Sequence, residues 1–557
     1  MIPEDPSAAS PIPPSPVPPV NPSATVPESA ENAGRRSARA TGIVSIAILC
    51  SRLLGLVREV AFAAYFGGGP LMDAFKVAFK IPNLLRDLFA EGALSVAFVT
   101  TFTKKFTLEG EDAAWQLGNK VATLAAVFMS AVTLIGIVAA PWLVLLMAKG
   151  FTPAQMVLTI WLTRLMFPFI LLVSLSALVM GMLNARRIFF WPAMASSFFN
   201  LGSIISGVVL ARWLDPHFGA RSLTGLAIGT LIGGVLQLVV QFPSLWKLGY
   251  KYRPDFGWKD PGVKQVLSLM GPAVIAASAV QVNVMVNTTF ASHLQQGSIS
   301  WLEWAFRLMQ LPIGLFGVAV ATITLPQISS DAALDALDAF RTNLARGMRL
   351  AFALTIPCTV GLAVLAEPII SLIYQRRNFD LEDTLGTAGA LRYYVIGLAA
   401  YAGIKVIAPA FYSLNMRTIP MMVSFFSIIL NFGLNWMLTY QMGLGVRGLA
   451  LSTGLVAMCN FGLLYGILWK RLGRLEGKAM VVTLGKLAAG GGILALTSWA
   501  GRQYLLEPLA THAFPLRALA LTGVIGVGGA LYLAVCMLLG VDELTSFTKI
   551  LKRRIVH

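Results

Sequence analysis

The stretch MDAFKVAFKIPNLLRDLFAEGALSVAFVTTFTKK, residues 72–105, carries a stripe of polar side chains where a membrane helix should be apolar. At roughly 100° per residue this stripe occupies one narrow sector of a helix, and its members are Asp73, Lys76, Lys80, Asn83, Asp87 and Glu91. One interpretation is an amphipathic helix on the membrane surface, followed by a separate span. The uncharged part, residues 92–103, is too short for that, because a bilayer needs roughly 20 apolar residues.

A span that ends at residues 104–105 must therefore reach back to about residue 84 and bring Arg86, Asp87 and Glu91 into the membrane. Each such charge costs about 2.5 to 3.5 kcal/mol at the bilayer centre. A helix with several of them is tolerated only where they face water or one another. The stretch thus predicts a charged, water-filled chamber inside a membrane protein.

The composition extends this prediction to the whole chain. Of the 557 residues, 56% are hydrophobic and 12% are charged, which is far from the balance of a soluble globular protein. Apolar runs separated by turn or charge signals predict an all-α, polytopic membrane protein with about fourteen transmembrane helices. The predicted spans lie near residues 41–66, 73–103, 121–147, 156–183, 188–213, 222–246, 266–292, 300–327, 347–374, 386–413, 418–440, 446–469, 479–500 and 515–540.

Positive charge orients the predicted spans. Lysines and arginines collect before the first span and after the even-numbered ones, in loops such as residues 247–264 and 341–349. Because cytoplasmic loops carry the excess of positive charge, we expect both termini in the cytoplasm. Loop placement also accounts for most of the net charge of +17, and we find no nucleic-acid motif. The four cysteines lie singly in apolar runs and the four histidines are scattered, so we expect no disulfide, metal site or cofactor.

The predicted spans divide the chain into four parts. Residues 1–36, with PIPPSPVPPV at their centre, are rich in Pro, Ser and Ala, which predicts a disordered cytoplasmic tail. Residues 37–260 and residues 261–475 hold six spans each. Residues 476–557 hold a nearly uncharged, glycine-rich pair of spans and a basic C-terminus.

An internal echo relates the two sets of six spans. The AFK of residues 78–80 and the LF of residues 88–89 match the AFR of residues 305–307 and the LF of residues 315–316 at one constant offset. The two segments are six spans apart. Because six is even, the halves should have the same orientation, as in parallel-repeat transporters.

Cations in the first half favour an anionic ligand. Arg52 lies near the middle of the first predicted span, where its side chain cannot easily reach either membrane surface. The guanidinium fork binds phosphate through two hydrogen bonds, so surplus arginines in a wet chamber suit a phosphate-bearing substrate. The predicted ligands in this half are Arg52, Arg58, Lys80 and Arg86, and the predicted cavity or gating carboxylates are Glu59, Asp73, Asp87 and Glu91. The alternative is a set of buried salt bridges that only join helices.

In the second half the eighth predicted span holds Glu303, Arg307 and Gln310 on one face. Most of this span could cross the membrane without Arg307, which would leave that side chain near the interface. The echo with Lys80 favours a position in the chamber instead, and we therefore add Arg307 to the predicted substrate ligands.

Amide side chains in the second half also have helical spacing. Asn283 pairs with Asn287, Asn431 pairs with Asn435, and Thr453 lies in the next predicted span. Such pairs usually make hydrogen bonds between membrane helices. An ion site at Asn431, Asn435 and Thr453 is the alternative. The acidic groups outside the spans have the spacing of solvated helix faces, so we expect no catalysis.

Four stretches closely resemble the MurJ (MviN) family of lipid II flippases. They are SRLLGLVRE at residues 51–59, MDAFKVAFKIPNLLRDLFAEGALSVAFV at 72–99, GSISWLEWAFRLMQLPIGLFGVA at 297–319 and KVIAPAFYS at 405–413. The resemblance runs from about residue 41 to the C-terminus. It implies a MATE-like fold of the MOP exporter superfamily, with two six-helix lobes around a central cavity and two C-terminal helices that form a groove for a lipid tail. By motif it implies cavity roles for Arg52, Arg58, Asp73, Arg86, Glu91 and Arg307.

The resemblance also implies a function in cell wall biogenesis. Family members move lipid II, the undecaprenyl-pyrophosphate-linked peptidoglycan precursor, from the cytoplasmic to the periplasmic leaflet of the bacterial inner membrane, here by alternating access. Membrane lipid, a coupling ion and the cell-wall synthesis machinery are the further partners that we expect. Alternatives are a flippase for another polyprenyl-linked saccharide, a cation-coupled exporter of the MATE type, or a membrane enzyme or scaffold for wall synthesis.

Three positions depart from the family pattern. Phe306 stands where related sequences often have Asp, Gln310 stands where Glu is common, and Thr100 replaces a usual Pro. The loss of two carboxylates argues against a proton relay in this part of the eighth span. With fewer carboxylates of the protein nearby to pair with it, Arg307 is more available to bind a pyrophosphate.

Overall fold

A computed structural model describes residues 30–473 and 475–544, within which every regular element is a helix. The side chains of residues 30–45, 90–93 and 276 are outside this description. The first helix begins at Ala30, so the last residues of the predicted tail are helical, whereas residues 1–29 lie outside the described part of the chain.

The chain folds into long helices joined by short loops. In order they are α1 (Ala30–Phe66), α2 (Pro70–Arg86), η1 (Asp87–Leu94), α3 (Ser95–Glu109), α4 (Glu111–Met147), α5 (Pro153–Met166), α6 (Phe169–Ala185), α7 (Phe190–Leu214), α8 (Ser222–Val239), α9 (Phe242–Lys247), α10 (Pro261–Ser292), α11 (Ser298–Pro312), η2 (Ile313–Gly317), α12 (Val318–Ala333), α13 (Leu337–Val364), α14 (Ala366–Tyr374), α15 (Leu381–Tyr394), η3 (Val395–Gly397), α16 (Leu398–Ser413), α17 (Thr418–Trp436), η4 (Met437–Gln441), α18 (Gly445–Leu472), α19 (Gly477–Gly501), η5 (Arg502–Leu506) and α20 (Phe514–Leu538).

Among the described residues, 12 helices are long and apolar enough to cross a membrane. Several of these spans consist of consecutive elements, as in α5 with α6 and α15 with α16. The helix α1 and the continuous α2–η1–α3 segment are of similar length but are not among the 12. The all-α membrane architecture is therefore confirmed, and the count of fourteen spans stays a prediction.

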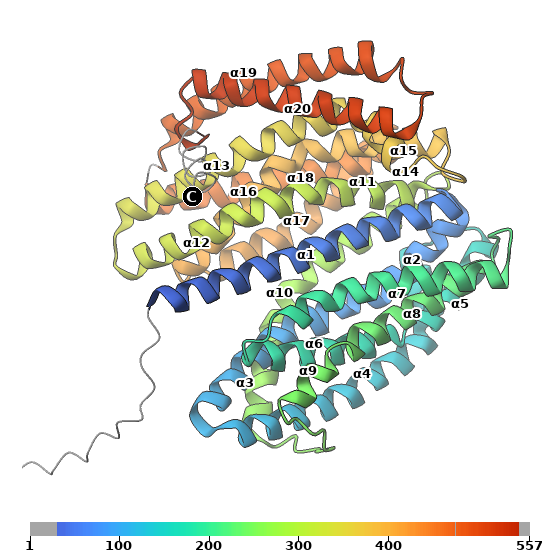
Figure 1. Cartoon of the computed structure of the whole chain (residues 1–557), viewed down its shortest axis with the longest axis vertical. Helices are drawn as coiled ribbons and strands as arrows, with labels where there is room; N and C mark the ends of the chain where they lie inside the picture. The colour runs from blue at the N-terminus through green and yellow to red at the C-terminus, as the bar shows by residue number, and fades with distance from the viewer. Residues whose placement is uncertain (1–29, 474, 545–557) are drawn as a thin grey trace, which may run out of the picture.

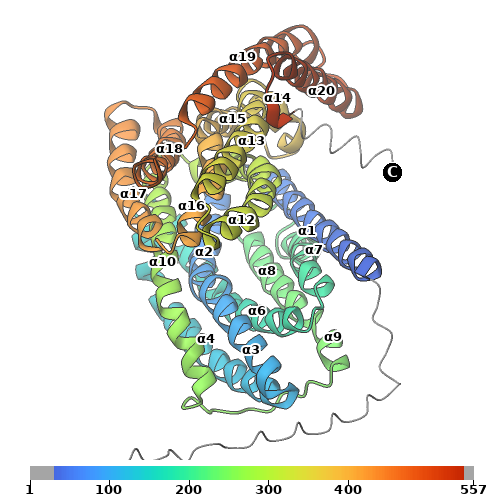
Figure 2. The same cartoon turned by 90° about the vertical axis from the view of Figure 1, so that its left-hand side faces the viewer.

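The helices form two groups with the long helix α1 running between them in the view of Figure 1. In the N-terminal lobe α7 packs along α8 and α1, and α6 packs against α4. In the C-terminal lobe α16 packs against α13 and α18, and α11 against α15. Helix α10 contacts both groups, since it packs on α3 and α4 and also on α17, and it descends along one side of the molecule in Figure 2.

The internal echo of the sequence has a structural counterpart. The α2–η1 and α11–η2 segments both change from an α-helix to a π-helix, at Asp87 in the first lobe and at Ile313 in the second. Residues 227 positions apart also meet between the lobes, because Asp73 of α2 accepts a hydrogen bond from the hydroxyl of Ser300 at the start of α11. A contact between equivalent positions is what a twofold pseudo-axis between two parallel repeats produces.

The last two long helices form a separate layer on the C-terminal lobe. Helices α19 and α20 pack against each other, and α19 lies on α13 (Figure 2). Arg349 of α13 holds their ends, because its guanidinium pairs with Glu476, just before α19, at 2.5 Å and with Glu543, just after α20. The Tyr532 hydroxyl of α20 also donates to the carbonyl oxygen of Ala353 at 2.8 Å.

Candidate functional site

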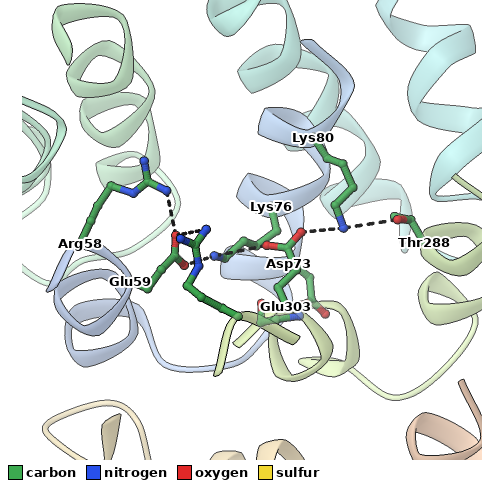
Figure 3. A network of polar contacts seen from close by, with 9 residues as sticks. Arg58, Glu59, Asp73, Lys76, Lys80, Thr288 and Glu303 are labelled. Atoms are coloured by element: carbon green, nitrogen blue, oxygen red, sulfur yellow. Dashed lines mark hydrogen bonds and ion pairs between the residues drawn. The ribbon is translucent and has the colours of Figure 1, made fainter. Parts of the chain in front are cut away.

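A cavity of about 500 Å³ lies where the two lobes meet. The Asp, Glu, Lys and Arg side chains that line it come from α1, α2 and α11, and Figure 3 shows most of them converging. They are Arg58, Glu59, Lys76, Lys80, Glu303 and Arg307. We call these six residues the charged cluster. Helix α2 forms one wall of this cavity, and Lys76, Lys80 and Asn83 of the predicted polar stripe line it, whereas Asp73 and Asp87 of the same stripe do not.

Ion pairs of the cluster cross from one lobe to the other. Glu59 of α1 pairs with Lys76 and lies 3.5 Å from the Nη2 atom of Arg307 on α11. Glu303 of α11 forms ion pairs in the opposite direction, with two lysines of α2. Its Oε1 atom lies 2.6 Å from Lys80 Nζ and its Oε2 atom lies 3.3 Å from Lys76 Nζ. Each lobe thus contributes a carboxylate that neutralises a cation of the other lobe.

The cluster has more cations than carboxylates, with four of the former and two of the latter. The most buried members, Glu59 and Lys76, have side chains 4% and 6% exposed and neutralise each other. The surplus is accessible, because the side chain of Arg307 is 41% exposed and that of Lys80 is 17% exposed. An anionic ligand that enters the cavity meets these two cations.

Arg58 has a more structural environment than the other cations. Its guanidinium lies 2.9 Å from Glu59 and 5.3 Å from the ring centroid of Phe199, within the range of a cation–π contact. This packing holds Arg58 in the cavity wall.

Two predicted ligands lie away from this cluster. Arg52 is exposed on α1, and its Nη1 atom lies against the backbone of Gly314 in η2, where a Cβ atom would approach to 1.8 Å. Arg86 pairs with its neighbour Asp87 at 2.7 Å, at the point where α2 becomes η1. Neither arginine lines the central cavity in this conformation. The side chain of Glu91 lies outside the described residues.

Asp73 does not face the cavity and instead joins the two lobes at one end of the molecule. Its carboxylate accepts hydrogen bonds from the backbone N–H of Gly297 at 2.7 Å and from the N–H and hydroxyl of Ser300 at 2.9 and 2.7 Å. Gly297 has a φ of 91°, a conformation that glycine adopts without strain, and it precedes α11 with no capping side chain of its own. Asp73 therefore caps the start of α11 from the opposite lobe.

A second carboxylate makes the reciprocal contact. Asp383 of α15 accepts from the backbone N–H of Gly68, in the loop between α1 and α2, and from Trp301 Nε1, both at 2.6 Å. A side chain at Gly68 would collide with Asp383, because its Cβ atom would lie 2.1 Å from the Oδ1 atom. Nearby, the side chain of Asn378 donates to the carbonyl oxygen of Tyr65 at 2.7 Å. We call this end of the molecule, where Asp73 and Asp383 join the two lobes, the gate end.

The amide residues of the second half form a polar seam between α10, α17 and α18. The Oδ1 atom of Asn287 accepts from the amides of Asn431 at 2.9 Å and Asn435 at 2.8 Å. The amide of Asn287 donates to Thr453 at 3.3 Å, and Asn435 accepts from Ser452. The expected hydrogen bonds between helices are therefore present, and the Oδ1 atoms of Asn287 and Asn435 both accept protein hydrogen bonds.

Sequence reasoning did not include Lys76, Glu303 and Asp383 among the site residues. A signal existed for the first two, because Lys76 lies one helical turn before Lys80 and Glu303 lies one turn before Arg307. These pairs are also equivalent in the internal repeat. Asp383 follows an ordinary loop, and its role depends on a backbone N–H of the other lobe, for which the sequence has no signal.

The comparisons with known proteins agree with this architecture. A profile of the family described as lipid II flippase MurJ matches residues 62–522. A probable lipid II flippase MurJ of Vibrio cholerae is 35% identical over 512 residues, which is 90% of this chain and 95% of that protein. A lipid II flippase MurJ of Burkholderia cenocepacia is 37% identical over 440 residues, covering 78% and 84% of the two chains.

Solved structures extend the likeness to three dimensions. A lipid II flippase MurJ in an inward closed conformation superposes with a TM-score of 0.70 at 26% identity, over 88% of this chain and 98% of the other. An inward-facing multidrug resistance MATE family transporter of the MOP superfamily gives a TM-score of 0.64 at 14% identity over 77% of this chain and 96% of the other, which shows a shared fold. On the strength of the profile match and these relatives, this chain belongs to the lipid II flippase MurJ family.

Proposed function

We propose that this protein is a lipid II flippase of the bacterial inner membrane, which moves the undecaprenyl-pyrophosphate-linked precursor to the periplasmic leaflet by alternating access. The observation that carries the proposal is the surplus of accessible cations in a cavity between two lobes. A pyrophosphate diester is an anion that hydrocarbon excludes, whereas its prenyl tail is compatible with lipid. A cationic cavity within a bundle of apolar membrane helices suits both parts of such a molecule.

The ion pairs between the lobes suggest how binding is linked to movement. A pyrophosphate at Arg307 and Lys80 competes with Glu59 and Glu303 for the same cations. Because these carboxylates and cations belong to different lobes, the ligand weakens attractions that hold the lobes in the present arrangement. We assign Arg307 and Lys80 as pyrophosphate ligands and Arg58 as a residue that orients Glu59.

The charge distribution orients the cycle. Loops rich in lysine and arginine lie at the end opposite the gate, for example between α9 and α10, so we place that end in the cytoplasm and the gate end in the periplasm. The cavity then loads from the cytoplasmic leaflet while Asp73 and Asp383 keep the periplasmic end closed. Arg52 and Arg86, which lie outside the cavity here, are proposed to meet the headgroup as it enters. We assign no role to a coupling ion at Asn431, Asn435 and Thr453.

A cation-coupled drug exporter is a poorer match to this site. An exporter of cationic compounds requires a cavity in which carboxylates dominate, and here the ionisable lining has the opposite sign. The six lining charges also show no arrangement for catalysis, so transport is the better description of the site.

The test is transfer of lipid II to the outer leaflet by the purified chain in vesicles. Arg307→Ala and Lys80→Ala should each reduce transfer at least tenfold, because each removes a cation from the ligand site. Arg471→Ala, which removes an exposed arginine whose guanidinium contacts Met416 outside the cavity, should leave transfer unchanged. Normal transfer in both cavity variants at equal protein levels would refute the proposed site.

A further inference from the structure

Three buried amide oxygen atoms in the described wall of the cavity accept no hydrogen bond. They are the Oδ1 atoms of Asn283 on α10, Asn431 on α17 and Asn460 on α18. All three residues line the cavity, and the hydrogen-bond partners of Asn283 and Asn431 show how their amides are oriented. A buried acceptor without a donor is unfavourable, and native proteins leave few of them.

The hydrogen bonds of the neighbouring hydroxyl groups assign the orientation of the Asn283 and Asn431 amides. Ser427 donates its own proton to the carbonyl oxygen of Ser424 at 2.6 Å and accepts from the amide nitrogen of Asn283 at 3.1 Å. The oxygen of Asn283 is therefore the end without a partner, and reversing the amide would place two acceptors together.

The same reasoning applies to Asn431 through one more step. Thr453 donates to the carbonyl oxygen of Leu449 at 2.9 Å, so it accepts from the amide nitrogen of Asn287. The oxygen of Asn287 then faces Asn431 and accepts from the amide nitrogen of that residue. The oxygen of Asn431 is left without a donor, and the residue is 2% exposed.

These two acceptors lie beside the cationic site. The side chain of Lys80 donates to Thr288 on α10 at 3.3 Å, one residue after Asn287. Asn283 lies five residues before Thr288 on the same helix, which is about 7.5 Å along its axis. A molecule whose anionic group contacts Lys80 can therefore extend along α10 past Asn287 to Asn283.

We infer that Asn283 and Asn431 form a subsite that accepts hydrogen bonds from the uncharged part of the headgroup, its saccharide hydroxyls or peptide N–H groups. This inference rests on the proposed function and adds a second contact region to it. The cations bind the pyrophosphate, and the amide oxygens distinguish a lipid with a sugar-peptide headgroup from the bare carrier lipid. The required ligand chemistry is a hydrogen-bond donor without negative charge, since an anion would meet two lone pairs.

The test compares three lipids with the full chain in nanodiscs, using affinities from native mass spectrometry. The probes are undecaprenyl pyrophosphate, the same lipid with the disaccharide but no peptide, and lipid II. Asn283→Leu and Asn431→Leu should each lower the affinity for lipid II about fivefold, which is the effect of one hydrogen bond. The affinity for undecaprenyl pyrophosphate should stay unchanged. If the variants already lose affinity for the disaccharide lipid, the donors are saccharide hydroxyls. If they lose affinity for lipid II alone, the donors are peptide N–H groups.

The matched control is Asn435→Leu, because both ends of that amide already have protein partners. This variant should lower thermal stability but keep the ratio of the affinities for lipid II and undecaprenyl pyrophosphate. Three results for the Asn283→Leu and Asn431→Leu variants would overturn the subsite. They are an equal loss of affinity for all three lipids, a change in affinity that depends on Na⁺ and not on the headgroup, and no loss of affinity at all. Wild-type protein that binds none of the lipids would refute the proposed function as well.

Discussion

The contact of Asp73 with the opposite lobe predicts how firmly the gate end is closed. Its carboxylate accepts three hydrogen bonds across the lobe boundary, and the residue is 2% exposed. Asp73→Asn replaces one oxygen by an NH₂ group, which faces an N–H donor, and converts the remaining bonds from charged to neutral. A hydrogen bond to a charged group contributes about 1.5–3 kcal/mol and a neutral one about 0.5–1.5 kcal/mol.

After the lower desolvation cost of the neutral amide is allowed for, the closed gate should lose about 2–4 kcal/mol. That free energy changes the ratio of open to closed gates by about 30- to 900-fold. Ser300→Ala removes one of the three bonds and should change the ratio by about tenfold. The free-energy effects of Asp73→Asn and Ser300→Ala on the closed gate should not be additive, because both substitutions act on the same contact.

The assay is the labelling rate of a single cysteine in the cavity by an impermeant maleimide added from the periplasmic side. Ser424→Cys, in a chain whose four cysteines are replaced by serine, places the thiol in the cavity lining. Asp73→Asn should accelerate labelling, and Asp87→Asn should not, because Asp87 pairs with Arg86 away from the gate. An unchanged rate in Asp73→Asn at equal protein levels would refute the assignment of this carboxylate to the gate.

Three further substitutions test other contacts. Glu303→Gln should increase the affinity for undecaprenyl pyrophosphate, measured by native mass spectrometry, because the carboxylate no longer competes for Lys80; weaker binding would contradict the exchange mechanism. Gly314→Val should displace the guanidinium of Arg52 and reduce lipid II transfer as much as Arg52→Ala does, with no further loss in the double variant. Arg349→Leu leaves two carboxylates at the ends of α19 and α20 without their cation and should destabilise the protein by about 3–5 kcal/mol in thermal unfolding, whereas Arg349→Lys should recover part of that loss.

The membrane character of the fold could be predicted because hydropathy and length restrict each segment strongly. The charged stripe of residues 72–105 was informative for the same reason, since charges inside a membrane helix must face water or partners. The echo around Lys80 and Arg307 also gave the relation between the lobes. The sequence did not predict one local departure from α-helical geometry. Helices α2 and α11 both continue into π-helices, which hydrophobic periodicity does not reveal.

The pairing within the site could not be predicted, because it depends on how two lobes meet. Arg52 and Arg58 lie six residues apart in one helix, yet Arg58 lines the cavity and Arg52 lies against η2. Similarly, Asp73 and Lys76 share the polar stripe, but Asp73 caps a helix of the opposite lobe and Lys76 pairs within the charged cluster. Helical spacing places residues on a face, whereas their partners depend on the residues that the tertiary fold brings opposite them.

The two sets of contacts between the lobes differ in a way that matters for transport. At the gate end Asp73 and Asp383 each bind a backbone N–H group of the opposite lobe, and they also bind the Ser300 hydroxyl and Trp301 Nε1. None of these donors lines the cavity. In the cavity Glu59 and Glu303 bind side-chain cations that an anionic substrate can also bind. Substrate can therefore change the second set directly and the first set only through movement of the lobes. A transporter needs this separation, because a ligand shifts a conformational equilibrium only through interactions that differ between the two states.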